Sequence, residues 1–230
     1  MIKRAASLAL VLALAACASG GGGPAGARSG SDGPGFRRTA DPGVVVATEL
    51  AFARMAKDKG QWTAFAEYAA KDAVMFVPEP VKAHEWLKGR ANPAASVEWE
   101  PYQVWSSCDG SLAVTKGPWK RADGSVGYFT TVWDRQEDGT YKRVLDQGDT
   151  LEAPLEEPEM VEAEVADCAA LTLPPPMIIG SKGTSLSGVS LDGTLRWMVI
   201  VGEDGSRSIY VWHWNGTDWS KTISEQVAAG

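Results

Sequence analysis

The hydrophobic positions of residues 41–88 repeat with the period of helices. Asp41 and Pro42 form a typical helix start, because an Asp side chain accepts hydrogen bonds from free amides and Pro fits the first turn. Gly60 is a typical helix end. The stripe between these signals consists of Val45, Glu49, Phe52 and Ala56. The pattern therefore predicts a long first helix.

Shorter elements follow this helix. A second helix is expected to carry the stripe Trp62, Phe65 and Ala69. Residues 73–77 form an apolar run that ends at Pro78-Glu79-Pro80, which is typical of a strand and a turn. Residues 83–88 favour a further helical turn or two.

From about residue 97 the hydrophobic period drops to two, the period of strands. The predicted strands cover residues 97–106, 111–119, 126–136 and 140–149. Asp-Gly pairs between them supply the positive backbone torsions of tight hairpins, and these pairs are Asp109-Gly110, Asp123-Gly124 and Asp138-Gly139. Helices followed by an antiparallel meander predict an α+β domain.

A second series of strands is predicted over residues 194–202, 206–214 and 217–224. The order of its turns echoes the first series, and both a true repeat and a chance likeness of two meanders remain open. Three strands make no adequate core alone, so this block should pack on the first or extend its sheet. Its aromatic residues form either that buried seam or a stacking platform for sugar or peptidoglycan; they are Trp197, Tyr210, Trp212, Trp214 and Trp219.

The composition indicates one globular protein. Of the 230 residues, 44% are hydrophobic and 22% are charged, which excludes wholesale disorder. The net charge of −7 is opposite in sign to that of a nucleic-acid binder, so no nucleic-acid partner is expected. No apolar run approaches the roughly 20 residues of a membrane-spanning helix.

Residues 1–17 have the pattern of a secretory signal peptide, with Lys3 and Arg4 before an apolar segment. Its end, Leu14-Ala15-Ala16-Cys17, resembles the lipobox of bacterial lipoproteins. Cys17 is therefore the expected lipidation site, carrying acyl chains such as palmitate, with an ordinary leader as the alternative. The absence of an acidic residue directly after Cys17 favours the outer membrane, facing the periplasm.

Two further segments read as connections. Residues 18–40 are rich in Gly and poor in apolar side chains, which is typical of a flexible tether. Residues 151–167 are acidic and contain no basic residue, which favours an extended linker or strap. The predicted folded regions are thus an α+β domain at 41–150 and a meander at 168–230.

Three segments of the first domain resemble the nuclear transport factor two-like superfamily, in particular its SnoaL-like branch. They are Glu49-Leu50-Ala51-Phe52-Ala53, the run from Phe65 to Val74, and the hairpin from Thr131 to Asp146 with Trp133, Asp138-Gly139 and Tyr141-Lys142. The resemblance implies helices packed on a strongly curved antiparallel sheet, a cone-shaped, cystatin-like roll with an apolar pocket at its open end. The C-terminal meander would extend this roll.

The resemblance also suggests where a pocket would lie. It implies that Tyr68 and Asp72 lie near the cavity mouth and that Trp133 and Asp146 lie on the two final strands. Tyr68 and Trp133 are therefore candidates for the pocket, and Tyr68, Asp72 and Asp146 are candidates for acid–base catalysis. The full Asp, Tyr and protonated Asp set of ketosteroid isomerase-like members is not matched. Cap, turn or core roles remain open for each candidate.

Other chemistry finds little support in the sequence. The chain has 2 His residues, so a histidine-rich metal site is excluded and a Ser-His-Asp arrangement has few ways to form. No metal or other cofactor is expected. Of the 3 Cys residues, Cys17 is assigned to lipid, which leaves Cys108 and Cys168 to pair in an oxidising compartment. A disulfide between them is expected, with two unpaired thiols as the alternative.

Three functions are consistent with these features. The preferred one is a membrane-anchored envelope lipoprotein whose cone binds a small apolar ligand or an envelope protein, without catalysis. The second is a SnoaL-like acid–base enzyme of the isomerase, cyclase or dehydratase type that acts on a lipid- or steroid-like substrate. The third is an aromatic-rich interaction module for a partner or a cell-wall glycan. A dimer is compatible with all three.

Overall fold

The computed structural model describes residues 40–169 and 183–229, all within one compact unit that spans Arg37–Gly230. The predicted signal peptide, Cys17 and nearly all of the predicted tether lie outside the described residues. No helix in the described ranges is long and apolar enough to cross a membrane.

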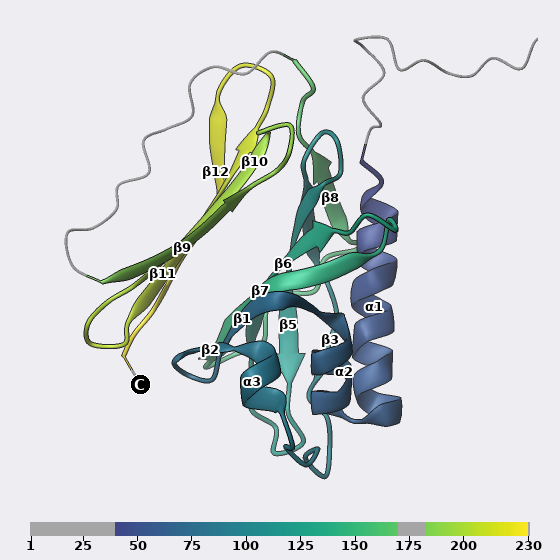
Figure 1. The fold of residues 1–230 in the computed structure, drawn as a ribbon, viewed down its shortest axis with the longest axis vertical. Coiled ribbons are helices and arrows are strands. Elements are labelled where there is room, and N and C mark those ends of the chain that lie inside the picture. The colour runs from purple at the N-terminus through teal and green to yellow at the C-terminus, as the bar shows by residue number, and fades with distance from the viewer. Residues whose placement is uncertain (1–39, 170–182, 230) are drawn as a thin grey trace, which may run out of the picture. The chain divides into compact units, whose positions relative to one another are not determined.

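Three helices lie on one face of a large curved sheet (Figure 1). They are α1 (Pro42–Lys59), α2 (Gln61–Tyr68) and α3 (Ala83–Leu87). Asp41 caps α1 as predicted, since its Oδ1 accepts a hydrogen bond of 2.9 Å from the amide of Gly43. The buried residues of α1 are the predicted stripe, Val45, Glu49, Phe52 and Ala56. The stripe directs the helix onto the sheet, because its Val45, Phe52 and Ala56 pack with Val104, Ala113 and Trp133 of the strands.

The first sheet has eight strands in the order β2-β1-β7-β6-β5-β4-β8, with β3 paired to β5. The strands are β1 (Ala69–Phe76), β2 (Pro80–Lys82), β3 (Glu98–Trp99), β4 (Gln103–Ser106), β5 (Leu112–Lys120), β6 (Val126–Arg135), β7 (Tyr141–Leu151) and β8 (Glu162–Val165). The predicted α+β class is confirmed, although two pairings, β1 with β7 and β4 with β8, are parallel. The strand predicted over 97–106 divides at Pro101, which has no amide to donate to a ladder.

Two segments differ in extent from the sequence prediction. Ala69 begins β1, where the pattern placed it on the second helix. The acidic segment 151–167 contains β8, which pairs with β4 along the edge of the sheet. The acidic side chains of β8 remain exposed, which explains why its composition resembles that of a linker.

A second, antiparallel sheet has the order β12-β11-β10-β9. It comprises β9 (Thr184–Val189), β10 (Leu195–Val201), β11 (Arg207–Trp214) and β12 (Trp219–Val227). The hydrophobic pattern predicts β10, β11 and β12. It misses β9 because that strand is rich in Ser and contains Gly188, both of which weaken the strand signal.

The second sheet repeats the geometry of strands β4 to β7. Ser106 pairs with Ala113 in the first sheet, and Val189 pairs with Arg196 in the second. Each residue of the second pair lies the same number of positions after its counterpart in the first pair, so the two strand pairs have the same register. The last two strands of each series also share an irregularity: a bulge lies between Val132 and Trp133 and again between Val211 and Trp212. A shared register and bulge are specific features of backbone geometry. We therefore describe β9–β12 as a structural repeat of β4–β7.

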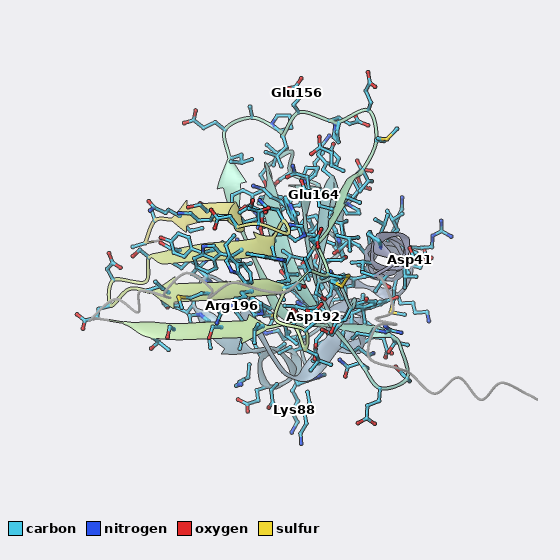
Figure 2. All side chains as sticks on the ribbon, turned by 90° about the horizontal axis from the view of Figure 1, so that it is seen from above. Asp41, Lys88, Glu156, Glu164, Asp192 and Arg196 are labelled. Carbon is cyan, nitrogen blue, oxygen red and sulfur yellow. A yellow bond between two sulfur atoms is a disulfide. The ribbon has the colours of Figure 1, made fainter. Side chains whose placement is uncertain are left out.

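The two repeats pack face to face through one hydrophobic cluster. Its members include Leu112, Val114, Val132 and Leu145 from the first sheet and Leu195, Trp197, Val211 and Ile223 from the second. The Asp-Gly turns also bind each other: Asp109 N donates to Asp192 Oδ2 over 2.9 Å, and Asp192 N donates to Asp109 Oδ2 over 3.1 Å. Figure 2 shows Asp192 at this junction. The reciprocal bonds fix one repeat against the other.

The expected disulfide between Cys108 and Cys168 is confirmed, with 5.3 Å between the two Cα atoms. Cys108 lies in the Asp109 turn, and Cys168 follows β8. The bond ties together residues 60 positions apart and stabilises the fold by about 4 kcal/mol in the chain-entropy model. Cys108 and Ala166 pack against Trp214, so the bond lies where β8 and both repeats meet.

Candidate functional site

A cavity of about 550 Å³ lies between the helices and the inner face of the first sheet. Its walls are largely aromatic, and the rings are those of Phe52, Trp62, Phe65, Phe76, Trp86, Trp99, Trp119 and Phe129. They come from all three helices and from β1, β3, β5 and β6. A concave, mostly apolar cavity with a few polar groups is the usual form of a small-molecule site.

The rings that line the cavity contact one another. Phe52 of α1 lies 4.7 Å from Trp99 and 5.0 Å from Phe65, measured between ring centroids. Trp62 and Trp86 meet edge to face at 5.1 Å. Such edge-to-face pairs add stability beyond the area they bury. The walls are thus held in place by their own contacts.

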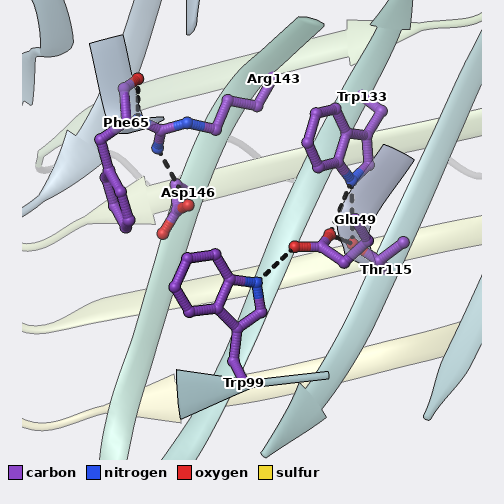
Figure 3. Close-up of polar contacts among 7 residues, drawn as sticks. All are labelled: Glu49, Phe65, Trp99, Thr115, Trp133, Arg143 and Asp146. Atoms are coloured by element: carbon purple, nitrogen blue, oxygen red, sulfur yellow. Dashed lines mark hydrogen bonds and ion pairs between the residues drawn. The ribbon is translucent and has the colours of Figure 1, made fainter. Parts of the chain in front are cut away.

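The floor of the cavity carries a carboxylate, Asp146, beside a buried guanidinium, Arg143 (Figure 3). Arg143 Nη1 donates to Asp146 Oδ2 over 2.9 Å, and Nη2 donates to the carbonyl oxygen of Phe65 over 2.7 Å. Burial raises the pKa of Asp146, while the charge of Arg143 and a hydrogen bond from Thr131 oppose the rise. A carboxyl group therefore faces an apolar space, where a hydrogen-bonding ligand group has little competition from water.

Arg143 and Asp146 share a face because of the bulge in β7. Residues three apart on a regular strand point to opposite faces of the sheet. Here Trp133 pairs with Arg143 while Val132 pairs with Leu145, so β7 holds one extra residue, Val144. The extra residue turns both charged side chains toward the cavity.

A second carboxylate, Glu49, lies behind the aromatic wall and is fully buried. Its Oε1 accepts from Trp99 Nε1 over 2.7 Å, and its Oε2 accepts from Thr115 Oγ1 over 2.6 Å and from Trp133 Nε1 over 3.1 Å (Figure 3). Burial raises the pKa of Glu49 to about 7, although these hydrogen bonds oppose the rise. Glu49 does not line the cavity, but it holds the wall residue Trp99.

The second repeat contributes to the cavity through Arg207 of β11. Its Nε donates to Gln147 Oε1 over 3.1 Å, and its Nη2 donates to the carbonyl oxygen of Gly148. The guanidinium also lies over the ring of Phe76, 4.8 Å from the centroid. Arg207 thus connects the second sheet to β1 and β7 beside the cavity.

The structure places the four predicted site residues differently. Asp146 lines the cavity. Tyr68 is half-buried behind the wall, 5.0 Å from the ring of Phe52, and Trp133 is fully buried beside Glu49; neither lines the cavity. Asp72 is exposed at the surface, where its carbonyl oxygen accepts from Lys82 Nζ over 3.3 Å. Only one of the three catalytic candidates therefore reaches the cavity.

Sequence reasoning missed the roles of Glu49 and Arg143. Glu49 had a visible signal, because it is the one charged residue on the apolar stripe of α1. Arg143 had none, since its orientation depends on a bulge that no turn residue announces. Within the described ranges, no group of His, Cys, Asp and Glu residues could hold a metal ion.

Comparisons with known proteins show only that part of this chain is similar in fold to some solved structures. No family model matches the chain, and no curated protein does. Among solved structures, one described as an aromatic ring hydroxylase from Novosphingobium aromaticivorans is 18% identical, with 49% of this chain and 90% of that chain covered and a TM-score of 0.38. One described as a ketosteroid isomerase from Parabacteroides distasonis is 14% identical, with 51% of this chain and 98% of that chain covered and a TM-score of 0.40. A nuclear transport factor two-like protein of unknown function from Mesorhizobium loti is 14% identical, with 46% of this chain and 93% of that chain covered and a TM-score of 0.28.

We predict that Glu49 makes stability depend on pH. Its pKa is 4.5 ordinarily and about 7 in the fold, so its contribution to stability is fully present below pH 4.5 and is lost as the pH rises through 7. The loss should amount to about 3 kcal/mol. Urea unfolding at a series of pH values should show this fall in the native protein and a smaller one in Glu49→Gln. Parallel pH curves for the two proteins would contradict the assignment.

Proposed function

We propose that the protein binds a small, largely apolar ligand in the cone cavity. The observation that carries the proposal is a space of about 550 Å³ walled by aromatic rings, with Asp146 as the carboxylate at its floor. Burying an apolar ligand against these rings supplies affinity, and the carboxylate fixes its orientation. Similar folds serve different functions, so the proposal rests on the site and not on the fold.

The charges around the cavity floor narrow the ligand class. Arg143 balances the charge of Asp146, and the other charged residues of the lining, Glu79, Asp149, Arg121 and Arg207, sum to zero, so the ligand needs no net charge of its own. Because a carboxylate only accepts hydrogen bonds, the ligand should present a hydroxyl or N–H donor at one end. A flat aromatic or polycyclic molecule with one such donor matches both the walls and the floor.

We predict that the neutral aromatic amine N-phenyl-1-naphthylamine binds in this cavity. Trp62, Trp86 and Trp99 line the space, so energy transfer from tryptophan to the probe should report binding. Trp86→Ala removes one wall and should weaken binding about tenfold. The matched control is Trp212→Ala, which removes the same ring from the second sheet and should leave the affinity unchanged.

Two results would contradict this proposal. One is an affinity for the probe that Trp86→Ala and Trp212→Ala change equally. The other is a probe that binds only after the protein has lost its native near-ultraviolet circular dichroism, because that binding would report exposed core and not a formed cavity.

We further propose that the protein is a lipoprotein of a bacterial envelope, anchored in the outer membrane and facing the periplasm. Leu14-Ala15-Ala16-Cys17 and the Gly-rich tether support this, and so does the disulfide, because such bonds persist in oxidising compartments. A lipid at Cys17 followed by the predicted tether would leave the cavity free to exchange ligand with the periplasm.

The anchor leads to a direct prediction. Mass spectrometry of the mature N-terminus should find an acylated Cys17, and Cys17→Ser should move the protein from the membrane to the soluble fraction. Cys108→Ala is the control, because it removes a cysteine without touching the lipobox and should stay with the membrane. An unmodified N-terminus that starts elsewhere would refute the anchor.

Acid–base catalysis is the second candidate function, and the position of Asp146 favours it. Burial in the cavity raises the pKa of the Asp146 carboxyl group, and a carboxyl group with a raised pKa that faces a cavity is a candidate acid or base. Asp146→Asn should then abolish turnover of a substrate, and native near-ultraviolet circular dichroism of the variant would show that the cavity is still formed. Full turnover by this variant would remove the only catalytic candidate that lines the cavity.

A further inference from the structure

The repeat relates the cavity face of the first sheet to a face of the second sheet that no described helix covers. The equivalent positions follow from the shared register and bulge: Trp133 corresponds to Trp212, Arg143 to Lys221 and Asp146 to Ser224. In the first repeat α1 packs on this face and encloses Trp133. In the second repeat the face points away from the first sheet (Figure 1). Trp212 on this face is only half-buried.

We call this face the outer face. It consists of the side chains that alternate, along the strands of the second sheet, with those buried between the two sheets. Its twelve positions are Ser185, Ser187, Val189, Arg196, Met198, Ile200, Ser208, Tyr210, Trp212, Lys221, Ser224 and Gln226. The face contains two cations, Arg196 and Lys221, and no acidic residue, in a chain whose net charge is −7. Neither cation has a carboxylate partner among the described residues. Figure 2 labels Arg196 on this sheet.

Two aromatic rings lie beside these cations. The ring centroids of Tyr210 and Trp212 are 5.7 Å apart, and their planes are inclined by only 32°. Lys221 Nζ lies 5.4 Å from the centroid of Tyr210, and Met198, the cross-strand neighbour of Tyr210, is buried. The rings are therefore supported by the sheet, and Tyr210 already has a positive charge over its ring.

We propose that the outer face binds an acidic glycan. Sugar rings have apolar C–H faces that pack on aromatic rings, and their hydroxyl groups match the serine and glutamine side chains around Tyr210 and Trp212. The carboxylates of the glycan would pair with Arg196 and Lys221, for which charge complementarity is the argument. This site is separate from the cavity and does not depend on the ligand proposed there.

The composition favours a glycan over other partners. Ser and Lys are depleted in the cores of protein–protein interfaces, whereas four of the twelve outer-face positions are Ser. A lipid surface would require several protruding apolar side chains, but Met198 is buried, Ile200 is only half-exposed and Val189 is the one exposed apolar side chain among the twelve positions. A face of hydroxyl groups, two rings and two cations is best matched by a polar, ring-containing anion.

The test measures binding of the full chain to polygalacturonate, an acidic polysaccharide, and to dextran, a neutral one. We expect binding to polygalacturonate and a loss of about tenfold on Trp212→Ala. Arg196→Gln combined with Lys221→Gln should cause a similar loss and reduce the dependence of affinity on salt. The matched control is Lys120→Gln, which lies outside the outer face and should bind as the native protein does.

Several results would overturn the proposal. Loss of binding in the cation double variant with no effect of Trp212→Ala would show nonspecific attraction of polyanions. Binding of phosphatidylglycerol vesicles, or of an acidic helical peptide, that depends on Trp212 while polygalacturonate does not bind would assign the face to a membrane or to a protein. Retained affinity for the naphthylamine probe in the outer-face variants confirms that they are folded, so the two proposals can fail independently.

Discussion

The bulge at Val144 is the constraint on which the cavity chemistry depends. Without the extra residue, Arg143 and Asp146 would point to opposite faces of β7, and one of them would enter the hydrophobic seam between the sheets. An unpaired buried charge is strongly destabilising, because it loses water and gains no partner. The same bulge sets the register of Arg143 against Trp133, whose indole reaches Glu49. One backbone irregularity thus positions the floor of the cavity and the support of its wall.

The junction of the two repeats is a second constraint, and it explains why the second sheet is stable without helices. A four-stranded sheet with one buried face needs a surface to pack against. Here that surface is the face of the first sheet opposite its helices. Reciprocal bonds between the turns at Asp109 and Asp192 fix the relative placement, and the Cys108–Cys168 disulfide ties the residue that follows β8 to the turn at Asp109. Arg207 links the second sheet to the cavity, because its side chain joins β11 to the backbone of β7.

The sequence predicted most elements because their signals are local. The cap at Asp41, the stripe of α1, the Asp-Gly turns and the period of the strands depend on neighbouring residues, and each is present in the fold. The site was predicted less well. Asp146 lines the cavity, but Asp72 is exposed and Tyr68 lies behind the wall, since a position near the end of a helix does not determine which way a side chain points. The roles of Arg143 and Lys221 follow from bulges, and a bulge is a property of two paired strands that periodicity in one strand does not reveal.

Equivalent faces of the two repeats differ in charge, and this difference follows from what covers them. The cavity face is enclosed, so its carboxylates Glu49 and Asp146 share one buried cation, Arg143, and the pKa of each is raised by burial. Arg121 and Arg207 also line this cavity, but they are matched in number by the carboxylates Glu79 and Asp149, so the space offers an anion no excess of positive charge. No described helix covers the outer face, where Lys221 and Arg196 have no carboxylate partner among the described residues and Ser224 stands in place of the acid. The same backbone geometry therefore favours a neutral hydrogen-bond donor where helices cover it and an anion where they do not.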